Sequence, residues 1–158
     1  ANAMNGDWPS YGGTERGQRY SPLDQITPQN VGKLEEVWRY RTGDIPGPND
    51  PSETTAENTP LKVGDDLLMC TAMNILVSVD ARTGEENWRY DPEVPAEAIP
   101  YGATCRGVSA YTDPSTTEGD ACATRVIQAT LVKPPMRALL AATRATVTVR
   151  GPWSSQRR

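Results

Sequence analysis

An all-β fold is predicted for this chain by three observations. Between residues 59 and 90, short β-favouring segments alternate with turn residues. The connections between these segments are short enough to force antiparallel neighbours. A short motif, in which two glutamates and one further residue precede Trp-Arg-Tyr, occurs twice, at Trp38 and at Trp88. The first two observations predict a sheet of hairpins, and the third predicts that part of it is repeated.

Four strands are expected in this region, and three tight turns join them. The turns are Gly64-Asp65-Asp66, Met73-Asn74 and Ala81 to Gly84, where a glycine can adopt the positive φ that closes a hairpin. An up-and-down sheet of this size that recurs every 40 to 50 residues or so is typical of a β-propeller blade. The expected strands are TPLKV (59–63), LLMCT (67–71), ILVSVD (75–80) and EENWRY (85–90).

The repeated motif is interpreted as an outer strand that occurs once per blade. Trp38 and Trp88 then occupy equivalent positions, and each lays a large apolar ring against a neighbouring blade. Chance repetition of a tripeptide is the alternative, and the paired acids at 35–36 and 85–86 weigh against it. Residues 34–40 have no hairpins before them, so we expect a single N-terminal strand whose partners are missing from this chain.

Composition excludes several classes of site. The chain contains no histidine, which excludes histidine-based catalytic triads and zinc sites. The three cysteines, Cys70, Cys105 and Cys122, lack paired zinc-type spacing, so one disulfide and one buried thiol are expected, as suits an oxidising compartment. No apolar run approaches the roughly 20 residues of a membrane-spanning helix.

Charge divides the chain in two. Residues 1–130 hold all 20 acidic residues and 10 basic ones, whereas residues 131–158 hold 6 basic residues and no acidic one. Binding of nucleic acid by the basic tail is disfavoured, because no aromatic residue beyond Trp153 is interleaved with its charges. No nucleic-acid partner is predicted.

A family resemblance covers about residues 6–130. Ala81, Thr83, Gly84 and Trp88 match the Ala-x-Thr-Gly-x-x-x-Trp docking motif of dehydrogenases that use pyrroloquinoline quinone (PQQ). The chain also resembles the start of the periplasmic domain of the membrane-bound glucose dehydrogenase type in the longer runs GDWPSYGGTERGQRYSPLDQIT, WRYRTGD, PNDPSETTAENTPLKVGD and TCRGVSAY. The resemblance implies a fragment of an eight-bladed propeller that holds PQQ on its axis beside a calcium or magnesium ion.

Two residues take cofactor-binding roles from this resemblance. Glu57, just before the first strand of the blade, matches a carboxylate that contacts PQQ. Arg106 matches an arginine that pairs with the carboxylates of the quinone, a task that suits a planar donor fork. The alternatives are a solvated loop acid and a surface salt-bridge arginine. No residue is assigned to catalysis or to the metal, because the family's base and metal ligands lie in later blades.

A disulfide between Cys105 and Cys122 is expected in this context, because the two residues flank a polar loop. Cys70, within a predicted strand, is expected to be a free core thiol. Glucose dehydrogenases of this type carry a histidine before Thr-Cys-Arg-Gly, where this chain has Tyr101 and Gly102. This departure weighs against glucose itself and leaves another sugar, quinate, a polyol or another alcohol as the expected substrate.

The chain divides into three regions. Residues 1–5 are interpreted as a vector remnant or linker, and residues 6–131 as the N-terminal propeller portion, with one full blade at about 59–90. Residues 132–158 are interpreted as a non-native, frame-shifted tail, with a genuine basic extension as the alternative, because Pro134-Pro135 interrupts the strand pattern.

The resemblance implies a periplasmic enzyme, anchored in the inner membrane by a segment absent here, that oxidises a hydroxyl group and passes electrons to ubiquinone. The fragment itself is expected to be inactive, to hold no tightly bound cofactor, and to self-associate through open strand edges. A non-catalytic propeller scaffold is the alternative from another class, but it needs neither Glu57 nor the TCRGV segment.

Overall fold

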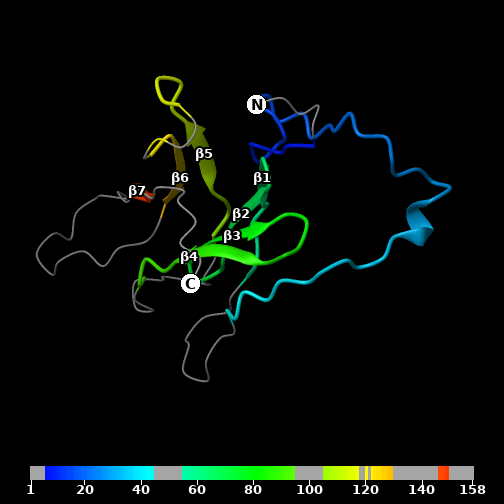
Figure 1. Cartoon of the computed structure of the whole chain (residues 1–158). Coiled ribbons are helices and arrows are strands. Elements are labelled where there is room, and N and C mark those ends of the chain that lie inside the picture. The colour runs from blue at the N-terminus through cyan, green and yellow to red at the C-terminus, as the bar shows by residue number, and fades with distance from the viewer. Residues whose placement is uncertain are drawn as a thin grey trace, which may run out of the picture.

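The computed structural model describes residues 6–44, 55–94, 105–117, 120 and 122–129, and the backbone of 146–149. Figure 1 shows two sheets side by side and a long N-terminal arm that leaves the first sheet and returns to it. The interpretations of residues 1–5 and of most of the 132–158 tail fall outside the described residues. The elements are η2 (Val31–Lys33, a 3-10 turn), β1 (Leu61–Val63), β2 (Asp66–Cys70), β3 (Leu76–Asp80), β4 (Glu86–Tyr90), β5 (Ser109–Thr112), β6 (Thr124–Ala129) and β7 (Thr146–Val149).

The first sheet confirms the predicted four-stranded antiparallel blade. Its strand order is β1-β2-β3-β4, so Trp88 lies on an outermost strand, as expected. Positive φ values at Gly64, Asn74 and Gly84 close the three turns. The second sheet has the order β5-β6-β7, also antiparallel.

A β-bulge in β4 decides which side chains share a face of the first sheet. Ser78 pairs with Trp88, but Val79 pairs with Glu86, so Asn87 is the extra residue. The bulge brings Glu86 onto the same face as Arg89, and Arg89 Nε donates to Glu86 Oε2 at 3.3 Å. Asn87 Nδ2 donates across the sheet to Asp66 Oδ1 at 2.6 Å.

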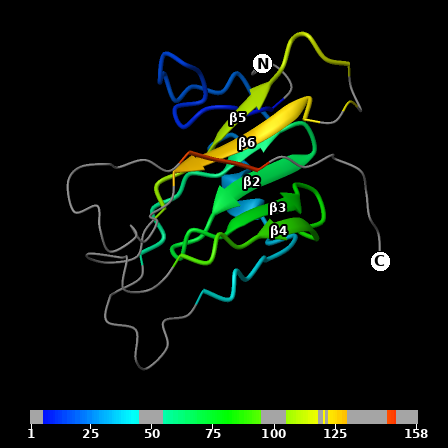
Figure 2. The same ribbon diagram turned by 90° about the vertical axis from the view of Figure 1, so that its left-hand side faces the viewer.

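The core lies between the two sheets. Leu61, Leu68 and Leu76 come from the first sheet and are each 1% exposed. Trp88 packs against this cluster from β4. Figure 2 shows β5 and β6 beside the first sheet, and β1 contacts β5. The second sheet and the segment before it contribute Cys105, Val108 and Val126.

The free edge of β1 is partly covered. Trp8 forms an isolated antiparallel bridge with Lys62, in which Trp8 N donates to Lys62 O at 2.8 Å and Lys62 N donates back at 3.1 Å. Lys62 Nζ also contacts Asp7 Oδ1 at 3.1 Å. One of the two edges expected to be open is therefore paired over this short stretch.

Residues 34–40 pair with no strand among the described residues, so the expected N-terminal strand, whose partners would lie outside this chain, stays a prediction. The segment lies along the β4 face that carries Glu86 and Arg89, and it is held mainly through side chains. Tyr40 Oη donates to Glu86 and accepts from Arg89 Nη2 at 2.9 Å, and Arg89 Nη2 also donates to the carbonyl of Thr42 at 3.1 Å. Burial raises the pKa of Tyr40, and the hydrogen bond to Glu86 raises it further.

Tryptophan docking is confirmed for Trp38. A Cβ atom built on Gly84 would lie 2.5 Å from Cδ2 and Cε3 of Trp38, so the indole ring rests on the glycine backbone. The turn that presents Gly84 is fixed by Asp80, whose Oδ1 accepts from the backbone N–H groups of Arg82 at 2.8 Å and Thr83 at 2.9 Å. The backbone N–H groups of Thr83 and Arg82 hold the pKa of Asp80 below its usual value. The sheet therefore lies between Trp38 on one face and its own Trp88 on the other.

Candidate functional site

Loops from both sheets meet where the blade begins. Because the strands are antiparallel, β1 and β3 begin, and β2 ends, at the same end of the sheet. Residues 55–60 and 71–75 form this end, which we call the entry end. Residues 105–108, which lead into β5, join it because Cys105 is bonded to Cys70. Segments before the first strand of each sheet therefore lie together.

The two residues predicted to bind a cofactor meet at the entry end. Arg106 Nε lies 3.4 Å from Glu57 Oε2, although 49 positions separate them. The side chains are 82% and 41% exposed, respectively. Such an exposed ion pair contributes only about 0–1 kcal/mol to stability. The fold therefore gains little from the pair, and both charged groups stay accessible to a ligand.

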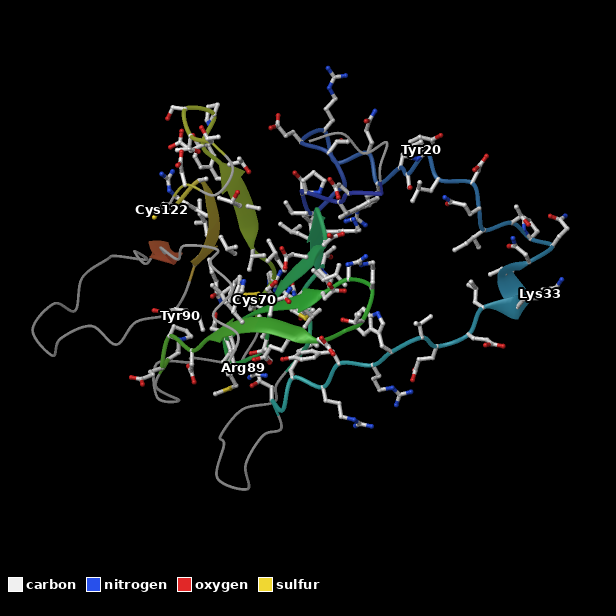
Figure 3. The ribbon with its side chains drawn as sticks, in the orientation of Figure 1. Tyr20, Lys33, Cys70, Arg89, Tyr90 and Cys122 are labelled. Atoms are coloured by element: carbon white, nitrogen blue, oxygen red, sulfur yellow. A yellow bond between two sulfur atoms is a disulfide. The ribbon has the colours of Figure 1, made fainter. Side chains whose placement is uncertain are left out.

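The disulfide joins Cys70 to Cys105, which corrects the predicted Cys105–Cys122 pairing, and Cys122 is the free thiol (Figure 3). The reason lies in the β5–β6 hairpin, in which Ser109 pairs with Ile127 and Thr112 with Thr124. Cys105 precedes the beginning of β5, whereas Cys122 precedes the beginning of β6, at the opposite end of the hairpin. The length of a four-residue ladder, about 10 Å at roughly 3.4 Å per residue, exceeds the reach of a disulfide.

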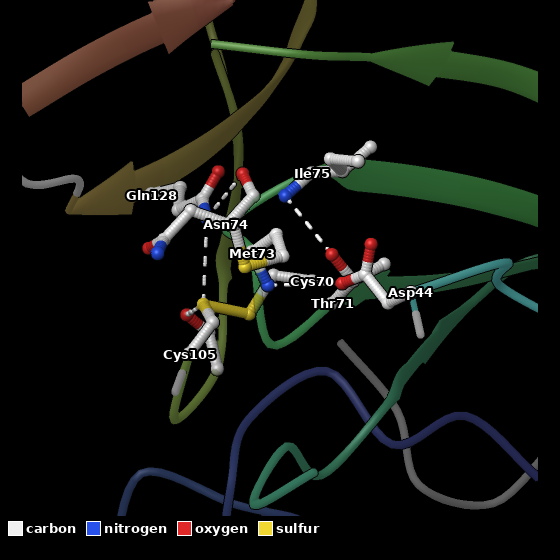
Figure 4. The surroundings of a disulfide bond; sticks show 9 residues. Asp44, Cys70, Thr71, Met73, Asn74, Ile75, Cys105 and Gln128 are labelled. Carbon is white, nitrogen blue, oxygen red and sulfur yellow. Dashed lines mark hydrogen bonds between the residues drawn. A yellow bond between two sulfur atoms is a disulfide. The ribbon is translucent and has the colours of Figure 1, made fainter. Parts of the chain in front are cut away.

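The surroundings of this disulfide contain a buried amide that the sequence analysis did not single out. Gln128 is 1% exposed, and its Nε2 donates to the carbonyl of Asn74 at 3.0 Å and to Cys105 Sγ at 3.4 Å (Figure 4). The available signal was a polar residue two positions after Val126, on the apolar face of a strand. Gln128 therefore ties the second sheet to a loop of the first.

The β2–β3 turn, whose Asn74 carbonyl accepts from Gln128, also bonds to the N-terminal arm. Asp44 Oδ2 accepts from Met73 N at 2.9 Å, and Ile75 N donates to Thr71 Oγ1 at 3.1 Å. Thr71 and Asn74 are each 4% exposed. The turn between β2 and β3 is therefore fixed by the N-terminal arm, by its own side chains and by the second sheet.

Two buried side-chain acceptors in the segments that form or contact the entry end have no protein partner. Asn58 Oδ1, next to Glu57 in the chain, and Gln128 Oε1 have no hydrogen-bond donor in the structure. Buried acceptors left unpaired in a folded protein require an explanation, and a ligand or an ordered water supplies donors in such places. Asn58 Oδ1, which follows Glu57 directly in the chain, is a candidate acceptor for a ligand or an ordered water.

Among the residues that the structure describes, no group of three or more acidic, cysteine or histidine side chains is arranged to hold a metal ion. Within the same residues, no helix has the length and apolarity needed to cross a bilayer.

A four-stranded up-and-down sheet, with a tryptophan ring docked on the glycine of one of its turns, is typical of a β-propeller blade. Residues 8–148 match the family model described as PQQ, glucose/ethanol/alcohol dehydrogenase, β-propeller domain. The chain belongs to this family of PQQ-dependent dehydrogenases. The predicted recognition is therefore confirmed.

Individual relatives agree with this assignment. The chain is 53% identical over 103 residues to quinoprotein glucose dehydrogenase from Escherichia coli, covering 65% of this chain and 13% of that protein. It is 44% identical over 131 residues to the glycerol dehydrogenase large subunit from Gluconobacter oxydans, covering 83% and 18%. The crystal structure of quinohemoprotein alcohol dehydrogenase from Comamonas testosteroni matches with a TM-score of 0.61 and 28% identity, covering 82% and 17%. The chain thus spans less than a fifth of each relative's length.

Proposed function

We propose that this chain forms the N-terminal part of an eight-bladed PQQ-dependent dehydrogenase that oxidises a hydroxyl group of a sugar or another alcohol. Bound PQQ, beside calcium or magnesium, supplies the acceptor for the two electrons removed from the substrate. Electrons then pass to ubiquinone, at the periplasmic face of the inner membrane. The observation that carries the proposal is the meeting of Glu57 and Arg106 at the entry end.

The residues present suit this cofactor. Arg106 offers a largely exposed guanidinium, and a planar fork of N–H donors binds a carboxylate in two parallel hydrogen bonds. Glu57 Oε2 lies 3.4 Å from Arg106 Nε, which places a carboxylate beside the guanidinium. Asn58, the next residue in the chain after Glu57, offers a buried acceptor at its Oδ1. In this proposal Arg106 binds a carboxylate of PQQ, and Glu57 contacts the cofactor beside it.

The substrate is left at the level of a hydroxyl compound, because the relatives act on different ones. Their names include glucose, glycerol and quinate/shikimate dehydrogenases. Tyr101 and Gly102, where a histidine is expected in the glucose enzymes, lie outside the described residues. We propose a sugar as the substrate, with a polyol or quinate as the alternative. The non-catalytic scaffold is the second class, and the Glu57–Arg106 pair favours the enzyme.

A chimera tests the proposed cofactor site. The matching segment of the Escherichia coli glucose dehydrogenase is replaced by residues of this chain, and PQQ affinity is measured by fluorescence titration of the apoprotein. Glu57→Gln and Arg106→Gln are each expected to weaken PQQ binding about 10- to 100-fold, since a hydrogen bond to a charged group is worth about 1.5–3 kcal/mol. Glu36→Gln and Arg39→Gln, which break another exposed ion pair, are the matched controls.

The controls are expected to stay within twofold of the unmodified chimera. Equal PQQ affinity in all five proteins would remove Glu57 and Arg106 from the site. A folded chimera that binds no PQQ would favour the non-catalytic scaffold instead.

We also propose that the isolated 158-residue chain is inactive with PQQ, calcium and sugar, and that it self-associates. The arm exposes Ile26, Leu34 and Val37 at 62%, 61% and 85%. These apolar side chains and the β4 edge supply surface for a second copy. Light scattering during dilution is expected to show a mass that falls with concentration. A monodisperse monomer at micromolar concentration, with a cooperative melt, would contradict self-association.

A further inference from the structure

Arg106 does not fix its own position. Its side chain is 82% exposed, and its ion-pair partner Glu57 is itself 41% exposed. Exposed ion pairs of this kind are weak and leave both side chains free to reorient. The direction in which the guanidinium leaves the protein is therefore set by the backbone next to it.

That backbone is anchored covalently on its N-terminal side. Cys105 immediately precedes Arg106, is 5% exposed, and is bonded to Cys70. Cys70 is 4% exposed, is the last residue of β2, and pairs with Leu76 of β3. Arg106 therefore directly follows a residue that is covalently bonded to a strand of the first sheet.

Gln128 supplies the second anchor. One primary amide has two N–H donors, and here one reaches the carbonyl of Asn74 and the other reaches Cys105 Sγ. The residue is almost fully buried in β6, and its Oε1 has no protein partner. A leucine or methionine would fill this volume without leaving an orphaned acceptor, so the amide is not explained by packing. Its donors hold Cys105 between the two sheets.

We propose that the Cys70–Cys105 disulfide and the Gln128 amide form a positioning unit that presents Arg106 to a carboxylate of the ligand. The identity of that ligand as PQQ rests on the proposed function, whereas the positioning of Arg106 does not. Without the unit, the backbone around Arg106 must be ordered when the ligand binds. Fixing the backbone of one residue costs about a factor of ten in affinity.

The test begins with the free 158-residue chain, in a Cys122→Ser background that removes the free thiol. The Arg106 Nε–H signal is assigned by its loss in Arg106→Gln, and its chemical shift is measured by NMR with and without Glu57→Gln. With the positioning unit intact, Glu57→Gln is expected to move this signal. In Gln128→Met, and in Cys70→Ser/Cys105→Ser, the chemical-shift change that Glu57→Gln causes at Arg106 Nε–H is expected to fall below half of its value with the positioning unit intact.

Gln128→Met keeps the disulfide and the side-chain volume. It therefore tests the positioning role of the unit even if the double cysteine variant does not fold. An unchanged response to Glu57→Gln in folded Gln128→Met would overturn the proposal, because a merely stabilising amide lowers the melting temperature without uncoupling the pair. The control is Ser78→Ala, which removes a buried hydrogen bond to Asp66 elsewhere in the blade. It is expected to leave the Arg106 response intact.

The second readout is PQQ binding by the chimera. Gln128→Met is expected to raise the dissociation constant for PQQ about tenfold and to leave the turnover of the saturated enzyme within twofold. An unchanged dissociation constant would overturn the positioning role in ligand binding. If no chimera binds PQQ while Gln128→Met still uncouples Arg106 from Glu57 in the NMR experiment, the proposed function fails and the positioning unit stands.

Discussion

Gly84→Ala is expected to destabilise the protein by about 2–5 kcal/mol. Gly84 has a φ of +73°, and an added Cβ would lie 2.5 Å from the Trp38 ring. The left-handed conformation costs a non-glycine residue about 1–2 kcal/mol, and overpacking adds about 1–3 kcal/mol. The free energy of unfolding is measured by urea denaturation followed by tryptophan fluorescence.

Gly64→Ala is the matched control, because Gly64 has a φ of +61° and no heavy atom within 4 Å of the added Cβ. It is expected to cost only the backbone term, about 1–2 kcal/mol. The difference between the two variants isolates the contact between Trp38 and Gly84. Equal losses would show that Trp38 does not dock on this turn.

Removing the Cys70–Cys105 disulfide is expected to cost about 3–4 kcal/mol. The bridge closes a loop with a sequence separation of 35, and loop-closure entropy of the unfolded chain predicts this range. The variant is Cys70→Ala/Cys105→Ala, and thermal unfolding followed by circular dichroism gives the change in stability. Cys122→Ser, which removes the free thiol, is the control and is expected to stay within about 0.5 kcal/mol.

Alkylation before and after reduction checks the pairing itself. In the native protein only Cys122 is expected to react, and peptide mapping is expected to recover Cys70 and Cys105 as one linked pair. A linked Cys105–Cys122 peptide would contradict the Cys70–Cys105 pairing. A large loss of stability in Cys122→Ser would point the same way.

The blade was predictable from sequence because its information is local. Hairpin turns at Gly64, Asn74 and Gly84 set the strand order, and alternating apolar residues set the buried face. The Trp-Arg-Tyr repeat predicted docking, and Trp38 does rest on Gly84. The bulge at Asn87, which brings Glu86 and Arg89 together, leaves no comparable signal in the sequence.

The disulfide pairing and the contacts of the N-terminal arm could not be predicted, because they depend on how segments far apart in the sequence pack together. Cys105 and Cys122 are close in sequence but lie at opposite ends of one hairpin, whereas Cys70 reaches Cys105 only because two sheets pack. The contacts of Arg89 with Tyr40 and Thr42, which hold the arm along the face of β4, also join segments far apart in the sequence. The cofactor-binding roles proposed for Glu57 and Arg106 come from the family resemblance, and only their proximity comes from the structure.

The most direct test of the central claim is an experimental structure of the chimera with PQQ bound. The measured quantity is the distance from the Arg106 guanidinium to the nearest PQQ carboxylate oxygen. We expect hydrogen-bond distances of about 2.7–2.9 Å, with Glu57 still in contact with Arg106 Nε. PQQ bound with Arg106 turned away into solvent, or with its carboxylates held only by residues outside this chain, would contradict it.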